Sequence, residues 1–141
     1  MSRTQDIKRA MRKREIITPP SLYLSTGSTL LNLACSGKVD CGFPVGHYFF
    51  IVGDSQSGKT FVGLTCLAEA TINPAFDNYR LIFDNGENGA LMDMERFFGR
   101  RMAERLEPPA MRDGEPYHSI TAEEMYYFID DAIKVGQPFI Y

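Results

Sequence analysis

The sequence predicts an α/β fold with three layers, in which helices cover both faces of a mostly parallel sheet. Apolar runs rich in aromatic and β-branched residues alternate with segments whose apolar residues recur at helical spacing. Their order is strand, helix, strand, helix, helix, strand, which favours right-handed crossovers and parallel pairing. A glycine-rich stretch, Gly53–Thr60, joins the first long apolar run to the helical segment after it.

Length and composition limit the class of protein. The 141 residues are enough for about one domain, and 44% hydrophobic residues provide for one core. The net charge of −3 argues against a nucleic-acid binder that is basic over its whole surface, although a local basic patch is compatible with it. We expect no membrane partner, because no run approaches the roughly 20 apolar residues of a membrane span and no secretory signal is visible.

The cysteines favour a reducing compartment. Cys35, Cys41 and Cys66 are an odd number, and none belongs to a Cys-x-x-Cys pair. The two histidines, His47 and His118, are far apart in the sequence, so the spacing does not indicate a zinc site. Free thiols suit the cytoplasm, which is the expected location.

Residues 1–20 form a basic amino-terminal arm that ends at Pro19-Pro20. We expect a solvated tail, and the alternative interpretation is contact with a phosphate backbone or a neighbouring subunit. Its positive charges are carried by Arg3, Lys8, Arg9, Arg12, Lys13 and Arg14. The remainder, residues 21–141, is predicted to be a single core.

The first half of that core begins with a capped short helix, indicated by Ser25–Ser28 and the apolar residues 30–34. After a loop over residues 36–46, the continuous apolar run Tyr48–Val52 predicts a strand buried on both faces. The helix after the glycine-rich stretch has a helical apolar pattern from Phe61 and ends near Asn73-Pro74.

The second half begins with a strand predicted over Tyr79–Asp84 and a loop over residues 85–89. A helix is expected over residues 91–106 and a surface linker over 108–116. Thr121 and Glu124 form a capping box. The apolar stripe of the helix behind it consists of Met125, Phe128, Ile129, Ala132 and Ile133, and a last strand begins at residues 139–141.

The glycine-rich stretch matches the pattern Gly-x-x-x-x-Gly-Lys-[Ser/Thr] and lies between a predicted strand and a helix. In this context the backbone amides wrap a phosphate group and the helix N-terminus adds a positive dipole. Lys59 would contact the β- and γ-phosphates, and the Thr60 hydroxyl would bind Mg²⁺. The predicted binding residues for ATP are Gly53, Asp54, Ser55, Gln56, Ser57, Gly58, Lys59 and Thr60.

Carboxylates near the second strand are the further candidates. Glu87 lies just past the carboxyl end of that strand, where it could orient the water that attacks a γ-phosphate; a solvated loop residue is the alternative. Asp84 is interpreted as a structural cap of the loop, with a water-mediated contact to Mg²⁺ as the alternative, and Asp93 as a helix cap or an adenine contact. A solvated face is favoured over a nucleic-acid-binding stripe for the arginines after Glu87, which are Arg96, Arg100, Arg101 and Arg105.

Three segments in order resemble the ATPase core of the RecA/RadA-type recombinases. Ser25-Thr26-Gly27-Ser28 is similar to the Ser-Thr-Gly segment of that family, and Gly42–Gly46 is similar to its Gly-hydrophobic-Pro-x-Gly turn before the nucleotide loop. Asp84–Gly89 resembles the strand end that carries the family's catalytic Glu, with one residue more between Asp84 and Glu87. The spacing and the short arm look closest to phage-encoded recombinases.

This resemblance implies a RecA-like nucleoside triphosphatase fold and a DNA-dependent ATPase of homologous recombination and repair. It implies Glu87 and Lys59 as catalytic residues, ATP and Mg²⁺ as cofactors, and filaments on single-stranded DNA with ATP between adjacent subunits. Residues 139–141 resemble the start of the strand whose far end holds a Mg²⁺-associated Asp in the family. We therefore expect an amino-terminal fragment that holds nucleotide and hydrolyses it poorly alone.

Two other functions are compatible with the sequence. One is a related helicase-type ATPase core of the same superfamily, which would form a ring. The other is a non-catalytic, regulatory module in which ATP only sets a conformation. The sequence has no Asn-Lys-x-Asp motif for guanine, which favours adenine.

Overall fold

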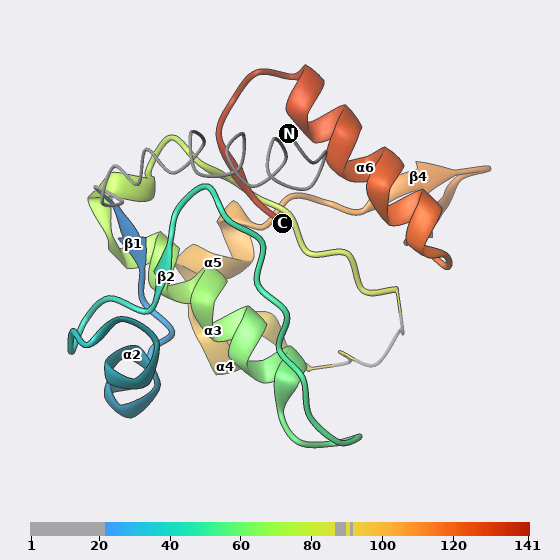
Figure 1. Ribbon diagram of the computed structural model, residues 1–141. Helices are drawn as coiled ribbons and strands as arrows, with labels where there is room; N and C mark the ends of the chain where they lie inside the picture. The colour runs from blue at the N-terminus through green and yellow to red at the C-terminus, as the bar shows by residue number, and fades with distance from the viewer. Residues whose placement is uncertain (1–21, 87–89, 91) are drawn as a thin grey trace, which may run out of the picture.

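The computed structural model describes residues 22–86, 90 and 92–141 of the chain (Figure 1). The strands are β1 (Tyr23–Leu24), β2 (Phe43–Pro44), β3 (Arg80–Leu81), β4 (Ala110–Arg112), β5 (Glu115–Tyr117) and β6 (Phe139–Ile140). The helices are α2 (Thr29–Ser36), α3 (Lys59–Ile72), α4 (Met94–Phe98), α5 (Arg100–Arg105) and α6 (Ala122–Lys134), with a 3₁₀ turn, η1, at Pro74–Phe76.

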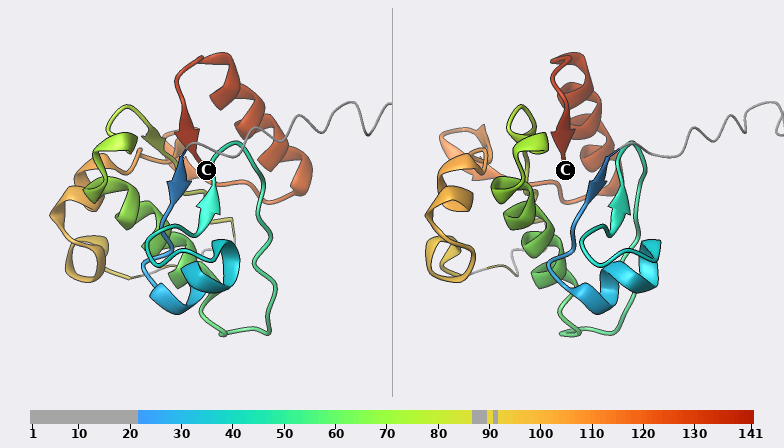
Figure 2. Two further views of the ribbon diagram at one scale, coloured as in Figure 1. Left: turned by 60° about the vertical axis from the view of Figure 1, so that its left-hand side comes forward. Right: turned by 90° about the vertical axis from the view of Figure 1, so that its left-hand side faces the viewer.

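Helix α3 is the central element of the fold. Figures 1 and 2 show it between α4 and α5 on one side and the unit of β1, α2 and β2 on the other. Its inner face buries Leu64, Leu67 and Ala70 completely or almost so. These side chains belong to one core cluster, which also contains Leu24, Cys66, Phe76, Leu81, Ala90 and Met102.

The amino-terminal unit is held together by one buried amide side chain. β1 and β2 pair antiparallel, and Ser28 caps α2 between them, which confirms the predicted capped helix. The Asn32 Oδ1 accepts hydrogen bonds from the Thr26 amide at 2.9 Å and the Thr26 hydroxyl at 2.8 Å. Its Nδ2 donates to the Val39 carbonyl at 3.0 Å. Buried polar groups are stable only when paired in this way, so Asn32 fixes the loop between α2 and β2.

The parallel pairing predicted for the second and last strands is confirmed. β3 and β6 are parallel neighbours, with Arg80 opposite Phe139 and Leu81 opposite Ile140. The Arg80 amide donates to the Pro138 carbonyl and the Ile82 amide to the Ile140 carbonyl, each at 2.9 Å. A two-pronged ion pair between Arg80 and Glu107, at 2.6 and 2.8 Å, covers one edge of the pair.

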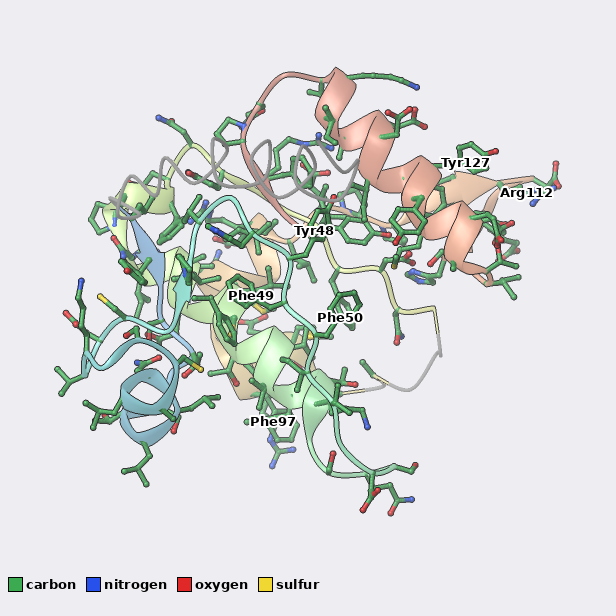
Figure 3. All side chains as sticks on the ribbon, viewed as in Figure 1. Tyr48, Phe49, Phe50, Phe97, Arg112 and Tyr127 are labelled. Atoms are coloured by element: carbon green, nitrogen blue, oxygen red, sulfur yellow. The ribbon has the colours of Figure 1, made fainter. Side chains whose placement is uncertain are left out.

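The predicted buried strand Tyr48–Val52 is wrong for the described structure. These residues form an extended segment without a strand partner among the described residues, and the exposed fraction of Phe50 is 88% and that of Val52 92%. Figure 3 shows Tyr48, Phe49 and Phe50 on this segment. Only Phe49 has a close ring contact, stacked on Phe43 at 4.5 Å. A continuous apolar run is buried only where strands flank it, and the described strands pair with one another instead.

The single helix predicted over residues 91–106 is two short helices. The break is at Gly99, whose φ of 87° and ψ of 159° belong to a backbone region essentially restricted to glycine. Asp93 caps α4 by accepting the Arg96 amide at 3.1 Å, which supports the capping interpretation of this residue. The glycine therefore stops the helix although the apolar pattern continues through it.

One of the arginines expected on a solvated face is instead half-buried. The Arg105 guanidinium donates to the carbonyls of Ala70 at 3.3 Å, Phe76 at 2.7 Å and Tyr79 at 3.1 Å. These carbonyls come from α3, from η1 and from the residue before β3. Arg105 thus closes the connection between the central helix and the strand that follows it.

The surface linker predicted over 108–116 contains a β-hairpin. β4 and β5 pair antiparallel around Asp113 and Gly114, whose φ angles of 54° and 87° are those of a hairpin turn. The Asp-Gly pair was the available sequence signal. The capping box of Thr121 and Glu124 is confirmed at the start of α6. Ile129 and Ala132 of the predicted stripe are buried, but Ile133 is 58% exposed, so the stripe is narrower than predicted.

The described part of the chain is therefore a mixed α/β structure whose sheets are three separate strand pairs. One of these pairs is parallel and two are antiparallel. The three-layer, RecA-like arrangement stays a prediction. The basic arm over residues 1–20 lies outside the described residues.

Candidate functional site

The glycine-rich loop curls back on itself before α3 begins. The Ser57 amide donates to the Asp54 carbonyl at 3.2 Å, which closes a tight turn. Gln56 has a φ of 63° and Gly58 a φ of 87°, so two of these residues adopt the left-handed conformation. That conformation costs a non-glycine residue roughly 1–2 kcal/mol. A glutamine held there is backbone strain of the kind that collects at ligand sites.

The Lys59 side chain spans the mouth of this loop. Its ammonium group donates to the Gly53 carbonyl at 2.9 Å and to the Asp54 carbonyl at 2.7 Å. The first residue of α3 is thereby tied to the first residues of the loop. The positive charge consequently lies next to the Gly53 and Asp54 carbonyl oxygens.

Gly53 lies close to the side chain of Ser57. A Cβ atom at position 53 would lie 2.7 Å from the Ser57 Oγ and 3.5 Å from the Ser57 Cβ. A larger residue there would therefore displace the Ser57 hydroxyl, which can rotate away.

The N-terminus of α3 favours an anion. The helix has 14 residues, no acidic residue in its first turn and no side-chain cap at Gly58. Amides at such an end have no intrahelical acceptor and carry the positive end of the helix dipole. Thr60 is exposed in the first turn, beside Lys59. Amides at an uncapped helix start, an ammonium group and a hydroxyl are together the groups that suit a phosphate chain with a bound divalent cation.

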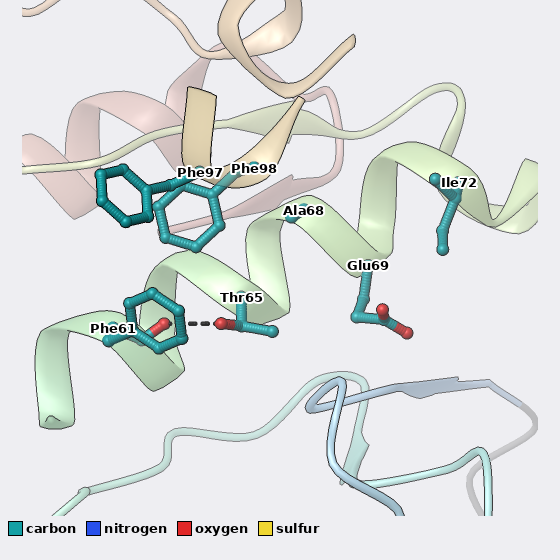
Figure 4. Close-up of a pocket in the computed structure, with 7 residues that line it drawn as sticks. All are labelled: Phe61, Thr65, Ala68, Glu69, Ile72, Phe97 and Phe98. Atoms are coloured by element: carbon teal, nitrogen blue, oxygen red, sulfur yellow. Dashed lines mark hydrogen bonds between the residues drawn. The ribbon is translucent and has the colours of Figure 1, made fainter. Parts of the chain in front are cut away.

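A groove runs along α3 from the residue after Thr60, and sequence reasoning did not identify it. It has a volume of about 290 Å³ (Figure 4). Phe61, Thr65 and Ile72 line it from α3, with Glu69 as its charged residue, and Phe97 and Phe98 line it from α4. The available signal was the recurrence of lining residues every three or four positions along α3. Phe98 packs against the core, whereas Phe97 is 58% exposed.

Asp84 is a structural carboxylate, as the sequence indicated, but it lies past β3, which covers only Arg80–Leu81 of the strand predicted over Tyr79–Asp84. One of its oxygens accepts the Ser119 amide at 2.9 Å, and the other accepts the Tyr141 hydroxyl at 2.6 Å and the Ser119 hydroxyl. Its side chain is 8% exposed. Burial acts to raise the pKa of Asp84, but the hydrogen bonds from Ser119 and Tyr141 outweigh it and hold the pKa below its ordinary value.

The same network reaches the loop that follows β3. The Asn85 amide donates to the His118 Nδ1 at 3.1 Å, and the Asn85 side chain accepts the Ala90 amide at 3.2 Å. A Cβ atom at Gly86 would lie 2.5 Å from the Ser119 carbonyl oxygen, so residues 118 and 119 pack directly on this loop. Glu87, the predicted catalytic carboxylate, lies outside the described residues.

The structure therefore brings the residues of the glycine-rich loop together through Lys59. The hydrogen bonds of Asp84, in contrast, are to Ser119 and Tyr141, not to that loop. Within the described ranges, no helix is both long enough and apolar enough to cross a membrane.

No protein-family model matches the chain, and no curated protein or solved structure matches it. The resemblance to a recombinase ATPase core therefore rests on the residues of this chain alone, and it stays a prediction.

The substitution Asp84→Asn should destabilise the protein in a pH-dependent way. At pH 7 we expect a loss of about 2 kcal/mol in the free energy of unfolding, because an amide N–H₂ would face hydroxyl donors. The folded-state pKa of Asp84 is lowered. The stabilisation by the ionised carboxylate is therefore full above the unfolded value, about 3.9, and is lost as the pH falls through the folded value.

Urea denaturation at pH 7 and pH 3 measures this difference. The matched control is Asp93→Asn, because asparagine caps a helix as well as aspartate does, and we expect a change within about 0.5 kcal/mol there. An Asp84→Asn loss of equal size at both pH values would contradict the assignment of the stabilisation to the charge.

Proposed function

We propose that this chain binds Mg²⁺-ATP through residues Gly53–Thr60. The observation that carries the proposal is the Lys59 ammonium group bound to the Gly53 and Asp54 carbonyls at the N-terminus of α3. This contact supports the interpretation of the motif as a phosphate-binding loop. It does not depend on the strand predicted over Tyr48–Val52.

Each group in the loop has a role in this proposal. The backbone amides of the loop and of the first turn of α3 surround the β-phosphate. Lys59 would contact the β- and γ-phosphates, and the Thr60 hydroxyl would help to hold the Mg²⁺. The bound cation supplies charge neutralisation of the phosphate chain. The absence of an Asn-Lys-x-Asp motif from the sequence favours adenine over guanine.

We further propose that the chain is the ATP-binding core of a DNA-dependent ATPase that acts in homologous recombination. The support is the order of three segments, at residues 25–28, 42–46 and 84–89, around the nucleotide loop. In this proposal Glu87 orients the attacking water, and subunits assemble on single-stranded DNA with nucleotide between them. A helicase-type core and a non-catalytic nucleotide-binding module are the alternatives, and the experiments below separate the second of these from the proposal.

The substitution Lys59→Ala should weaken the binding of Mg²⁺-ATP by about 10- to 100-fold, because a hydrogen-bonded cation facing phosphate is removed. Isothermal calorimetry on the folded chain measures the affinity. Lys38→Ala is the matched control, since Lys38 contacts the Tyr23 ring away from the loop, and its affinity should stay within about twofold of wild type. Equal affinities of wild type and Lys59→Ala would overturn the proposed binding site.

The substitution Glu87→Gln should remove hydrolysis and leave nucleotide affinity unchanged. Glutamine keeps the shape of the side chain but cannot act as a base toward water. Single-turnover hydrolysis of labelled ATP, with protein in excess, detects even a slow wild-type reaction. Loss of the wild-type hydrolysis in Glu87→Gln would exclude the non-catalytic module, whereas hydrolysis that survives in this variant would contradict the role of Glu87.

A DNA-dependent role predicts that ATP strengthens binding to single-stranded oligonucleotides and that this binding weakens steeply with salt, because phosphate contacts release counterions. Fluorescence anisotropy with a labelled oligonucleotide at several salt concentrations tests this, and the Lys59→Ala variant is the control for the effect of ATP. Affinity that is independent of both ATP and salt would count against a recombinase.

A further inference from the structure

His118 has two neighbours that compete for one nitrogen atom. Its Nδ1 accepts the Asn85 amide at 3.1 Å, and the same Nδ1 lies 3.4 Å from the Asp84 Oδ1. An imidazole nitrogen accepts a hydrogen bond only when it carries no proton. In the arrangement described here, therefore, His118 is neutral and its proton is on Nε2.

Protonation of Nδ1 would make the contact with the Asn85 amide unfavourable and the contact with Asp84 favourable. The new N–H would point at the Asn85 amide, which is also a donor, and would be attracted to the ionised Asp84 carboxylate. The two states thus exclude each other: either His118 holds the Asn85 amide, or it pairs with Asp84. His118 is half-buried, with 22% of its side chain exposed, so solvent protons can reach it.

The groups around His118 limit what else could act on it. Asp84 faces it from just past β3, and Tyr141, after β6, is hydrogen-bonded to the same carboxylate. On its own segment, Tyr117 is hydrogen-bonded to Glu124 of α6, which also accepts the Ile120 amide at 2.8 Å. Among the described hydrogen bonds and ion pairs, Asp84 is the one charged partner of the imidazole.

We propose that His118 is a positioning residue of the nucleotide site: its neutral imidazole holds the start of the loop after β3 through the Asn85 amide, and protonation releases that amide. The loop begins at the carboxyl end of a parallel strand pair, which is the edge where open α/β sheets bind ligands. Assignment of this loop to a nucleotide site rests on the proposed function. The competition between the Asn85 amide and Asp84 for the His118 Nδ1 does not depend on the proposed function.

Amide hydrogen exchange, followed by NMR on the isotope-labelled chain, tests the contact directly. After correction for the intrinsic pH dependence of exchange, the Asn85 amide should exchange about three- to tenfold faster once His118 is protonated, because one hydrogen bond is lost. The imidazole resonances give the titration of each histidine separately. His47 is the internal control, because it is exposed and its ring contacts the Val45 carbonyl at 3.2 Å instead.

Two variants distinguish the effect of the hydrogen bond on the Asn85 exchange rate from the effect of the shape of the ring. The Oδ1 of His118→Asn can accept the Asn85 amide at every pH, so protection there should be retained and should not change between pH 5 and pH 8. His118→Phe keeps a ring but offers no acceptor, so the amide should exchange fast throughout. If His118→Phe fails to fold, the comparison of wild type with His118→Asn still decides.

Exchange of Asn85 that is unchanged through the titration of His118, or that follows His47, would overturn the proposal. So would a His118→Asn variant whose Asn85 exchange retains the wild-type pH dependence.

Addition of Mg²⁺-ADP then tests the link to the nucleotide: at a pH where His118 is neutral, the Asn85 and Gly86 resonances should shift. Bound Mg²⁺-ADP without such shifts overturns the assignment to the site, whereas no affinity for Mg²⁺-ADP overturns the proposed function and leaves the measured His118–Asn85 contact standing.

Discussion

The candidate site depends on one interaction, the ammonium group of Lys59 held by the Gly53 and Asp54 carbonyls. This contact joins the first turn of a helix to the start of the loop before it. It places the positive charge of Lys59 against the backbone of residues 53 and 54. Without it, the turn between the Ser57 amide and the Asp54 carbonyl would remain, but the start of the loop would lose its side-chain link to α3.

That interaction has a fixed position because α3 is the most deeply packed helix of the described chain. Leu64 and Ala70 are fully buried on its inner face. On another face, Gly27 approaches so closely that a Cβ atom there would lie 2.4 Å from the Thr65 methyl group. The Ser-Thr-Gly segment of the sequence therefore has a packing role: its glycine lets the amino-terminal unit rest on the helix that carries Lys59.

The sequence predicted best those features that depend on neighbours in the chain. The Ser28 and Thr121 caps and a helix directly after the glycine-rich stretch, predicted from Phe61 and observed from Lys59, follow from local chemistry. Features that depend on distant partners were predicted less well. Burial of residues 48–52 needs flanking strands, and the contacts of Arg105 and His118 need segments more than 25 residues away to be adjacent. No pattern of spacing within one element encodes such contacts.

Arg105 links the helix α3 mechanically to the strand β3. Its planar guanidinium holds carbonyls at the end of α3, in η1 and just before β3, and a lysine could not span them with one rigid group. The helix that presents the ammonium group is thus fixed at its carboxyl end to the residue before β3, the strand that precedes Asp84. A displacement of α3 along its axis would be transmitted to β3. The glycine-rich loop before α3 and the hydrogen-bonded group of Asp84, Ser119 and Tyr141 beyond β3 would then move together.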